Sequence, residues 1–230
     1  MKVILMAKTQ LTEQFINEYS PNVPASDNEK LALIAIRNCY SPLKPSEILH
    51  AESERYFGDK ANGERLFKQI ANSKHTSTME HIHFAFSVED ISRAALAQLT
   101  RHRHFGFSVK SQRYVKYGSG DKSGGFDYVT PASVTGGKAH EIYDDFMHIA
   151  QETYDRLREA GIPAEDARNV LPNAATTHIV MSGNLRAILE FYGKRQEGRG
   201  AQAEIAELAE KMRQLVQECE PWTAHFFDVQ

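Results

Sequence analysis

Apolar and polar residues alternate most clearly over residues 81–88. Ile82, Phe84, Phe86 and Val88 fall on one side of this segment, and His81, His83, Ala85 and Ser87 fall on the other. A period of two predicts a strand with one buried face. Shorter apolar runs predict four further strands, over residues 2–9, 112–116, 126–130 and 176–181.

Most other apolar residues recur at helical spacing. This pattern predicts helices over residues 28–40, 46–57, 63–72, 91–103, 165–171 and 184–195. We expect Asp27 or Asn28 to cap the first helix, Ser46 the second, and Asp90 the helix that begins at Ile91.

Two longer helices carry apolar stripes. Ile142, Phe146, Ile149 and Leu157 mark one, which is expected to stop at Gly161 and Pro163. Ile205, Leu208, Met212, Leu215 and Cys219 mark the other. Residues 118–125 are rich in glycine and predict a surface loop. Because strands and helices mix without regular alternation, and because the chain shows no repeat or linker, we expect one α+β domain over residues 1–230.

The composition is that of an ordinary folded protein. A net charge of −3 and a pI near 6.4 exclude a globally basic protein that coats nucleic acid. Two cysteines, Cys39 and Cys219, cannot form a disulfide framework, which favours a reducing compartment. No run of eighteen apolar residues predicts a transmembrane helix, and the first residues resemble a strand more than a signal peptide. We therefore expect a soluble, cytoplasmic protein.

Charge is unevenly distributed along the chain. Residues 91–120 contain six basic residues and no Asp or Glu, together with His102 and His104. The six are Arg93, Arg101, Arg103, Lys110, Arg113 and Lys116. Guanidinium groups offer paired donors that match a phosphate, so this window predicts an anion site, with a solvated basic face as the alternative. Gln98 lies three residues before Arg101, on the same helical face.

Two other function classes stay open on these patterns. His75, His81 and His83 could form part of a metal site, although histidines on a strand face often only hydrogen-bond there. Aromatic residues alternate with basic ones over residues 101–117, as they do on surfaces that stack nucleic-acid bases.

Several segments in register resemble the flavin-dependent thymidylate synthases. Arg101-His102-Arg103 followed by Ser111 resembles the signature of that family. Further matching segments are Arg37–Tyr40, His75 with Glu80-His81, Ala167–Pro172, Asn184-Leu185-Arg186 with Arg195, Gln202–Ile205 and Pro221-Trp222. The resemblance covers about residues 30–225, in order, and is too extensive to be one chance motif.

The resemblance implies a fold and an activity. Members of the family have a mixed α/β subunit, here expected as a central, mostly antiparallel sheet flanked by helices. They are homotetramers whose active sites are shared between subunits. They bind FAD, reduce it with NADPH, and methylate dUMP to dTMP with 5,10-methylenetetrahydrofolate. No metal, nucleic acid or membrane is expected to take part.

The resemblance also assigns residues by position. Arg195 is expected to be catalytic, lying against the uracil and favouring its N3-deprotonated form. The residues expected to bind dUMP are Gln98, Arg101, Val109, Lys110, Ser111, Gln112, Arg113, Arg168 and Arg195. The residues expected to bind FAD are Cys39, His75, Ser77, Glu80, Arg101, His102, Arg103, Val109, Asn184, Arg186 and Glu190. Ser111 is interpreted as a ligand-binding hydroxyl, because no base is fixed beside it by sequence.

Four positions depart from the family pattern. Val109 stands where Glu or Gln is usual, Gly106 where Ser is common, Glu190 where Asn is frequent, and Arg199 where His is frequent. Valine has no side-chain acceptor, so any side-chain hydrogen bond made there in the family is lost here.

Overall fold

The chain folds into two compact units, which are described separately. The computed structural model describes residues 1–229, apart from the side chain of Lys60. Unit 1 consists of Met1–Lys2, Ser87–Arg103 and Phe107–Val180. Unit 2 consists of Val3–Phe86, His104–Gly106 and the described residues from Met181 onward. The single domain expected over residues 1–230 stays a prediction, and residue 230 lies outside the described residues.

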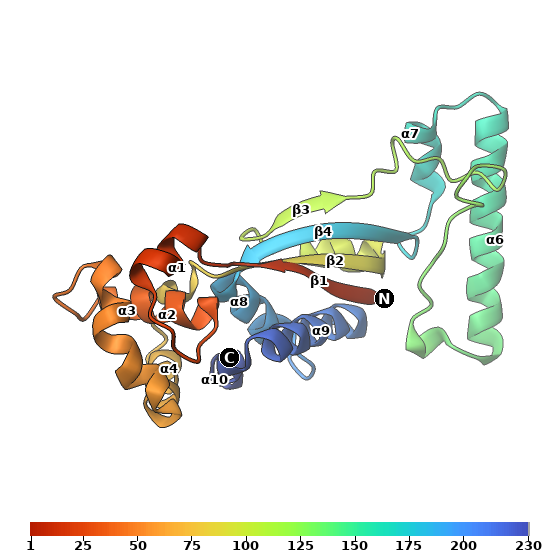
Figure 1. Ribbon diagram of the computed structural model, residues 1–230. Helices are drawn as coiled ribbons and strands as arrows, with labels where there is room; N and C mark the ends of the chain where they lie inside the picture. The colour runs from red at the N-terminus through yellow and green to blue at the C-terminus, as the bar shows by residue number, and fades with distance from the viewer. Residues whose placement is uncertain (230) are drawn as a thin grey trace. The chain divides into compact units, whose positions relative to one another are not determined.

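Four strands form one sheet, in the order β1-β2-β4-β3. They are β1 (Lys2–Lys8), β2 (His83–Ser92), β4 (Thr176–Asn184) and β3 (Gly106–Val109) (Figure 1). The backbone N–H of Leu185 donates to the carbonyl of Ile82 at 2.7 Å, and that of Arg93 to Ala175 at 3.1 Å. Because these pairs lie at opposite ends of both strands, β2 and β4 are antiparallel. The mixed fold with an antiparallel sheet is therefore confirmed.

Alternation in β2 is confirmed, since Phe84, Phe86 and Val88 are buried. The predicted end of this strand is wrong. β2 continues to Ser92, whose hydroxyl accepts from the N–H of Ala95 at 3.0 Å and caps the short helix α5 (Arg93–Leu99). Asp90 has a φ of 58°, so it lies within the strand in a left-handed conformation and caps nothing.

The strands predicted over residues 112–116 and 126–130 are also wrong. The N–H of Val115 donates to the carbonyl of Ser111 at 3.0 Å, which makes the first segment a turn. The second contributes one isolated bridge, between Tyr128 and Ala175. The strand of this region is β3, which pairs with β4. Its four residues are too few for an alternation of apolar and polar positions to be recognised in the sequence.

Unit 2 begins with four helices, α1 (Glu13–Tyr19), α2 (Asp27–Asn38), α3 (Pro45–Ser53) and α4 (Lys60–Asn72). The helix α1 was not predicted. Ser26 caps α2, and Ser26 and Glu29 form a capping box, so the expectation that Asp27 or Asn28 is the cap is wrong. The N-cap of α3 is Lys44 and not Ser46. A π-helix, η1 (Glu54–Gly58), continues α3.

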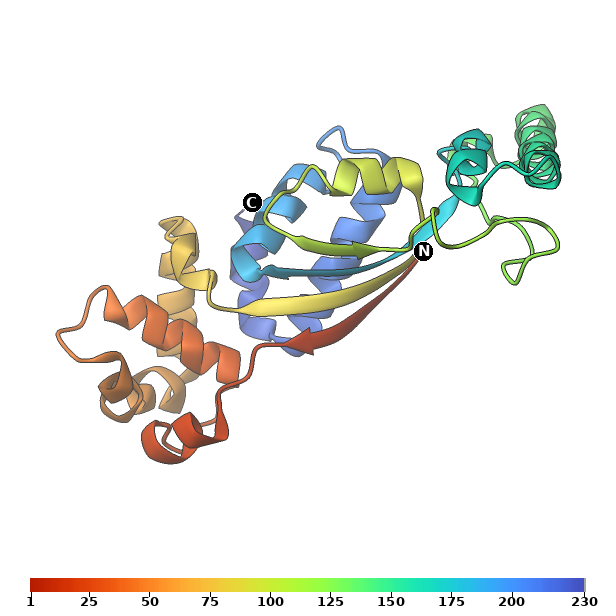
Figure 2. The same cartoon turned by 90° about the horizontal axis from the view of Figure 1, so that it is seen from above.

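The later helices of unit 2 are η2 (Thr76–Met79), α8 (Leu185–Arg195), α9 (Ala203–Cys219), η5 (Pro221–Thr223) and α10 (Ala224–Asp228). The helix α8 packs against α9, α10 and η2, and α4 packs against α10. The predictions for α8 and α9 are confirmed, and Ile205, Leu208 and Met212 are buried as their spacing implies. Figure 2 shows the same elements from above.

A buried carboxylate joins the two ends of unit 2. Glu220 is fully buried and accepts hydrogen bonds from Lys8 at 2.7 Å, Ser26 at 2.6 Å, Asn28 at 2.8 Å and Trp222 at 2.7 Å. Burial alone would raise the pKa of Glu220, but these hydrogen bonds hold it below its usual value. The carboxylate thus ties β1 and the start of α2 to the C-terminal segment.

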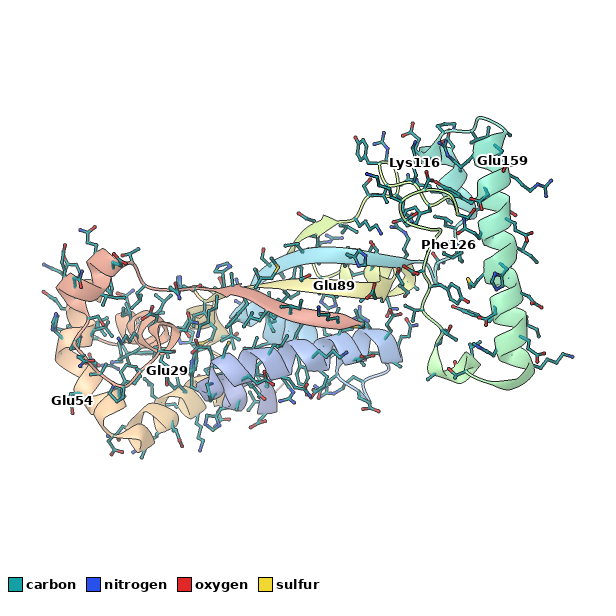
Figure 3. The ribbon with its side chains drawn as sticks, turned by 45° about the vertical axis from the view of Figure 1, so that its right-hand side comes forward. Glu29, Glu54, Glu89, Lys116, Phe126 and Glu159 are labelled. Atoms are coloured by element: carbon teal, nitrogen blue, oxygen red, sulfur yellow. The ribbon has the colours of Figure 1, made fainter. Side chains whose placement is uncertain are left out.

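Unit 1 contains α5, η3 (Ala132–Val134), α6 (Gly137–Glu159), α7 (Ala164–Ala167) and η4 (Arg168–Val170). Tyr117, Tyr154 and Ala167 form its buried cluster. Figure 3 labels Lys116 and Phe126 on the loop beside α6. The apolar stripe of α6 is only partly covered, since Ile142, Phe146 and Ile149 are 61%, 52% and 57% exposed.

Among residues 1–229, the structure has no helix with both the length and the apolar character needed to cross a membrane.

Candidate functional site

Arg186 lies at the centre of a charged group in unit 2. Its guanidinium donates to Glu80 at 2.5 Å and to Glu190 at 3.1 Å. Glu80 ends the 3₁₀ helix η2, and Glu190 lies one turn after Arg186 on α8. Hydrogen bonds to both carboxylates raise the pKa of the Arg186 guanidinium, which stays charged. The structure therefore brings together three residues that the resemblance assigns to FAD.

These three residues line a small pocket. Its volume is about 220 Å³, and its other lining residues are His104, Asn184 and Ala187. The side chain of Asn184 caps α8 by accepting from the N–H of Ala187 at 2.8 Å. A helix N-terminus favours anions, because its first N–H groups lack intrahelical partners. The pocket thus offers cationic donors together with carboxylate acceptors.

His104 is a site residue that the sequence assignment missed, although it directly follows the Arg101–Arg103 signature. Its position depends on a glycine. A Cβ at Gly183 would lie 2.6 Å from the Phe105 ring atom Cε1, so only glycine lets this ring lie against β4. The Phe105 ring is buried and meets Phe191 edge-on at 5.9 Å. Phe105 therefore anchors the backbone that presents His104.

A second group of predicted residues adjoins η2. The Oη of Tyr40 and the Nδ1 of His75 lie 2.9 Å apart, and their rings meet edge-on at 5.8 Å. Cys39, which precedes Tyr40 in the sequence, and Ser77, which lies in η2, are both exposed to solvent. The helix η2 packs against both α2 and α8. Packing on η2 is thus what gathers the unit 2 residues predicted for FAD from three distant segments.

Unit 1 holds most of the residues predicted for dUMP. Gln98 lies on α5, and its carbonyl accepts from the N–H of Arg101 at 3.3 Å as the helix ends. Arg101 and Arg103 are exposed. The signature therefore lies on a turn, where its guanidinium groups face solvent.

The segment after β3 forms a second cationic group in unit 1. The N–H of Lys110 donates to the carbonyl of His178 at 2.9 Å, and its Nζ lies 5.1 Å from the ring centre of Tyr117. The Oγ of Ser111 accepts from the N–H of Arg113 at 3.2 Å. Gln112 is buried, and its side-chain Nε2 makes no hydrogen bond among the described residues. Val109, in β3, has no polar side-chain atom.

Arg113 and Arg168, far apart in sequence, both contact Glu165. The Nε of Arg113 lies 2.9 Å from the Glu165 carboxylate, and the Nε of Arg168 donates to the Glu165 carbonyl at 2.9 Å. The Arg113–Glu165 ion pair is about half exposed, at 55% and 47%. An ion pair this exposed contributes little to stability.

Arg195, the residue predicted to be catalytic, is the last residue of α8 and belongs to unit 2. It is half-buried. The helix α8 therefore carries Arg186 near its start and Arg195 at its end, and the two arginines are nine residues apart in sequence.

The histidines considered for a metal site take other positions. His75 contacts Tyr40, whereas His81 and His83 are exposed. Over the described part of the chain, no three His, Cys, Asp or Glu side chains are grouped as metal ligands would be.

Comparison with known proteins gives a consistent set of matches. The model of a family described as "Thymidylate synthase complementing protein" matches residues 23–222. A flavin-dependent thymidylate synthase from Geobacter sulfurreducens is 39% identical over 199 residues, which cover 85% of this chain and 80% of that protein.

Two solved structures share the fold. A UMP/dUMP methylase, PolB, from Streptomyces cacaoi has a TM-score of 0.74 at 22% identity, covering 99% of this chain and 94% of the other. A flavin-dependent thymidylate synthase from Helicobacter pylori, complexed with FAD and dUMP, has a TM-score of 0.67 at 24% identity, covering 99% and 98%.

Proposed function

This chain belongs to the family of thymidylate synthase complementing proteins, and we propose that it is a flavin-dependent thymidylate synthase. The observation that carries the proposal is the family match over residues 23–222. The enzyme methylates dUMP to dTMP, with FAD as its cofactor and 5,10-methylenetetrahydrofolate as the carbon donor. We expect it to act in the cytoplasm.

The dUMP phosphate would bind to arginines of unit 1. Arg113 contacts the carboxylate of Glu165 and Arg168 contacts the main-chain carbonyl of the same residue, which supports a binding place for an anion beside the Arg113 guanidinium. A phosphate carries more charge than a carboxylate and accepts more hydrogen bonds, so it can compete with the Glu165 carboxylate for the Arg113 guanidinium. Ser111 and Lys110, which adjoin Arg113 in sequence, supply a hydroxyl and a second cation.

The donor set of the unit 2 pocket fits part of FAD. Arg186, His104 and the first N–H groups of α8 can donate to phosphate oxygens, while Glu80 and Glu190 can accept from sugar hydroxyls. A volume of about 220 Å³ holds only a portion of such a large cofactor. Cys39, His75 and Ser77, which adjoin or belong to the segments around η2, would contact another portion.

Arg195 would act on the pyrimidine. Its guanidinium is permanently charged and planar, so it can stabilise negative charge at N3 or at a neighbouring carbonyl of uracil. Gln98 and Arg101 would bind dUMP and hold its uracil ring in a fixed position. Bound FAD, reduced by NADPH, supplies the hydride, so the chain itself needs no nucleophile–base pair.

We further propose a homotetramer with shared active sites. On α6, the exposed side chains of Ile142, Phe146 and Ile149 lie on one face, at spacings of four and three residues. A contiguous apolar face of this kind usually contacts another protein surface. A second subunit of the same chain would cover it.

Purified protein tests the proposal directly. We expect flavin absorption near the usual 450 nm band after incubation with FAD, and formation of dTMP when dUMP, methylenetetrahydrofolate and NADPH are added. Omission of any one of the three should abolish the product. A protein that takes up no FAD, or that forms no dTMP when FAD is bound, would contradict the assignment.

A further inference from the structure

A polar hollow on the surface of α4 is formed by residues outside the sets proposed for FAD and dUMP. Its volume is about 690 Å³. Five of its lining side chains carry N–H or O–H donors, and one is a carboxylate: Arg65, Lys68, Gln69, Asn72, Ser73 and Glu64. All six are exposed. The hollow therefore offers mainly donors, and it is open to a ligand from solvent.

This part of the chain is basic, although the whole protein has a net charge of −3. Residues 60–74 contain four basic residues and a single acidic one, Glu64. The Glu64 carboxylate lies 3.9 Å from the Lys68 amine, and both side chains are more than half exposed, so their pair is weak. No carboxylate of the described residues is in ion-pair contact with Arg65 or Lys74. Their charges are therefore available to a ligand anion.

Lys74 occupies a backbone position that favours glycine. It follows Ser73, the C-cap of α4, and its φ is 56°. The N–H of Lys74 donates to the carbonyl of Ala71 at 3.1 Å, and that of His75 donates to Ile70 at 3.3 Å. These two bonds form a Schellman motif, which requires a left-handed residue and usually contains glycine there. A side chain at this position costs conformational energy.

Contacts within the protein do not explain why this residue is a lysine. The Lys74 side chain is exposed, so it does not pack into the core. Asp90 is the other non-glycine residue with a positive φ among the described residues, and its N–H donates to the Nδ1 of His178 at 3.3 Å. Left-handed non-glycine residues cluster at ligand sites. A ligand that binds the Lys74 amine would account for the side chain.

The same turn connects the hollow to residues proposed for FAD. His75 directly follows Lys74, and its Nδ1 lies 2.9 Å from the Oη of Tyr40. His75 is also the N-cap of η2, which carries Ser77. In the proposed reaction the pterin end of the folate carbon donor has to approach the flavin. The other end of the folate can then extend along α4.

We propose that Lys74 and the hollow on α4 bind the glutamyl tail of the folate carbon donor, which is a chain of carboxylates. This inference rests on the proposed function. Between Arg65 and Asn72 the helix rises about 10 Å, and Lys74 extends the row of donors beyond its end. A row of this length suits several carboxylates better than one phosphate. Arg65, Lys68 and Lys74 would supply the charge, and Gln69 and Asn72 would add amide donors.

Binding without turnover tests the inference. We would add FAD and dUMP to the full-length protein and titrate it with tetrahydrofolate that carries either one or three glutamyl residues, using isothermal titration calorimetry. We expect the triglutamate to bind about three- to tenfold more tightly than the monoglutamate. This preference should shrink as sodium chloride is added, because exposed charges are screened by salt.

Four variants locate the interaction. Lys74→Gly and Arg65→Gln should each reduce the preference for the triglutamate about two- to fivefold. Lys74→Arg retains the charge and should retain the preference. Lys122→Gln, which removes an exposed lysine from the loop over residues 118–125, is the matched control and should bind both folates like the parent.

Thermal unfolding separates the role of the side chain from that of the backbone. Lys74→Gly should raise the unfolding temperature by about 1–3 °C, because glycine adopts a left-handed conformation without strain. A lower unfolding temperature would mean that the lysine side chain supports the fold, and it would overturn the argument from strain.

Equal affinity of the parent protein for the two folates would overturn the inference, as would an unchanged preference in Lys74→Gly. Both results leave the proposed function intact. If neither folate binds, the proposed function fails and this inference fails with it, so the two failures are distinguishable.

Discussion

Arg186 and Glu80 are 106 residues apart in sequence, yet the guanidinium and the carboxylate lie 2.5 Å apart. Glu190 shares the same guanidinium. One arginine is thus held by two carboxylates in a pocket that also presents the N-terminus of α8. A guanidinium has five N–H donors, so a ligand anion can bind beside these two carboxylates, and a ligand hydroxyl can donate to either of them.

Loss of the Arg186 charge should weaken FAD binding. Arg186→Gln removes the central cation of the pocket and leaves Glu80 and Glu190 facing each other. We expect FAD affinity to fall by about tenfold or more, because hydrogen bonds to charged groups contribute about 1.5–3 kcal/mol. Fluorescence titration with FAD measures this. Arg213→Gln, which breaks a comparable pair with Glu210 elsewhere in unit 2, is the control and should bind FAD normally. Normal FAD affinity in Arg186→Gln would remove this residue from the site.

Arg195 should matter for turnover more than for binding. Arg195→Ala should keep its flavin spectrum but lose about 10²–10³ in rate, the usual cost of removing a preorganised donor. Arg195→Lys should recover only part of it, because lysine keeps the charge and loses the planar pair of donors. Assays of dTMP formation at saturating dUMP compare the two. If Arg195→Ala turns over like the parent enzyme, Arg195 is an ordinary cation at the end of a helix.

Arg113 and Arg168 should control the dUMP concentration that the enzyme needs. Arg168→Ala and Arg113→Ala should each raise the KM for dUMP about tenfold and change kcat little, since a phosphate contact contributes equally to substrate and transition state. Arg156→Ala, an exposed arginine of α6 in the same unit, should leave both constants unchanged. A selective loss of kcat in the first two variants would show that they act on the chemical step instead.

Glu220 should be the residue on which the stability of unit 2 depends most strongly. Glu220→Gln leaves Lys8 without its carboxylate, and because the Lys8 side chain is 33% exposed, the cost should lie below the roughly 3–5 kcal/mol of breaking a fully buried pair. Urea unfolding at pH 7 measures this cost. Glu210→Gln, which removes a more exposed pair with Arg213, should cost about 1 kcal/mol or less.

The effect of Glu220 should depend on pH. The folded pKa of Glu220 is lowered, so its contribution is present above the pKa of about 4.3 in the unfolded chain and is lost as pH falls through the folded pKa. The difference in unfolding free energy between parent and Glu220→Gln should therefore shrink below about pH 4. A difference that stays constant with pH would mean that Glu220 acts through packing alone.

The exposed face of α6 should hold the assembly together. Four chains of 26.0 kDa give a tetramer of about 104 kDa, which light scattering measures. Phe146→Asp places a charge in the middle of the apolar face and should yield smaller species. His148→Asp, on the other side of the helix, should leave the mass unchanged. A Phe146→Asp protein that keeps the parent mass would exclude this face from the interface.

Local patterns were sufficient for much of the fold. The alternation around Phe84 and Phe86 and the stripe from Ile205 to Met212 each describe one buried face, and the structure confirms both. Such patterns succeed because burial of a face depends on the period of the element itself. These patterns did not predict which residue caps a helix. Ser26 and Ser92 are the caps because their hydroxyls accept from an N–H three residues further on, whereas the nearby Asp residues do not cap these helices.

The candidate site divides in the same way. The sequence by itself determined the acid-free basic window over residues 91–120 and, through its motifs, the family. Only the tertiary structure decided that Glu80 meets Arg186, that Arg113 and Arg168 share Glu165, and that His104 joins the unit 2 pocket. Tertiary packing also decided that part of the stripe on α6 stays exposed. The period of a segment specifies which side of it is apolar, but contacts between distant segments depend on how loops close and elements pack, which no short window of sequence contains.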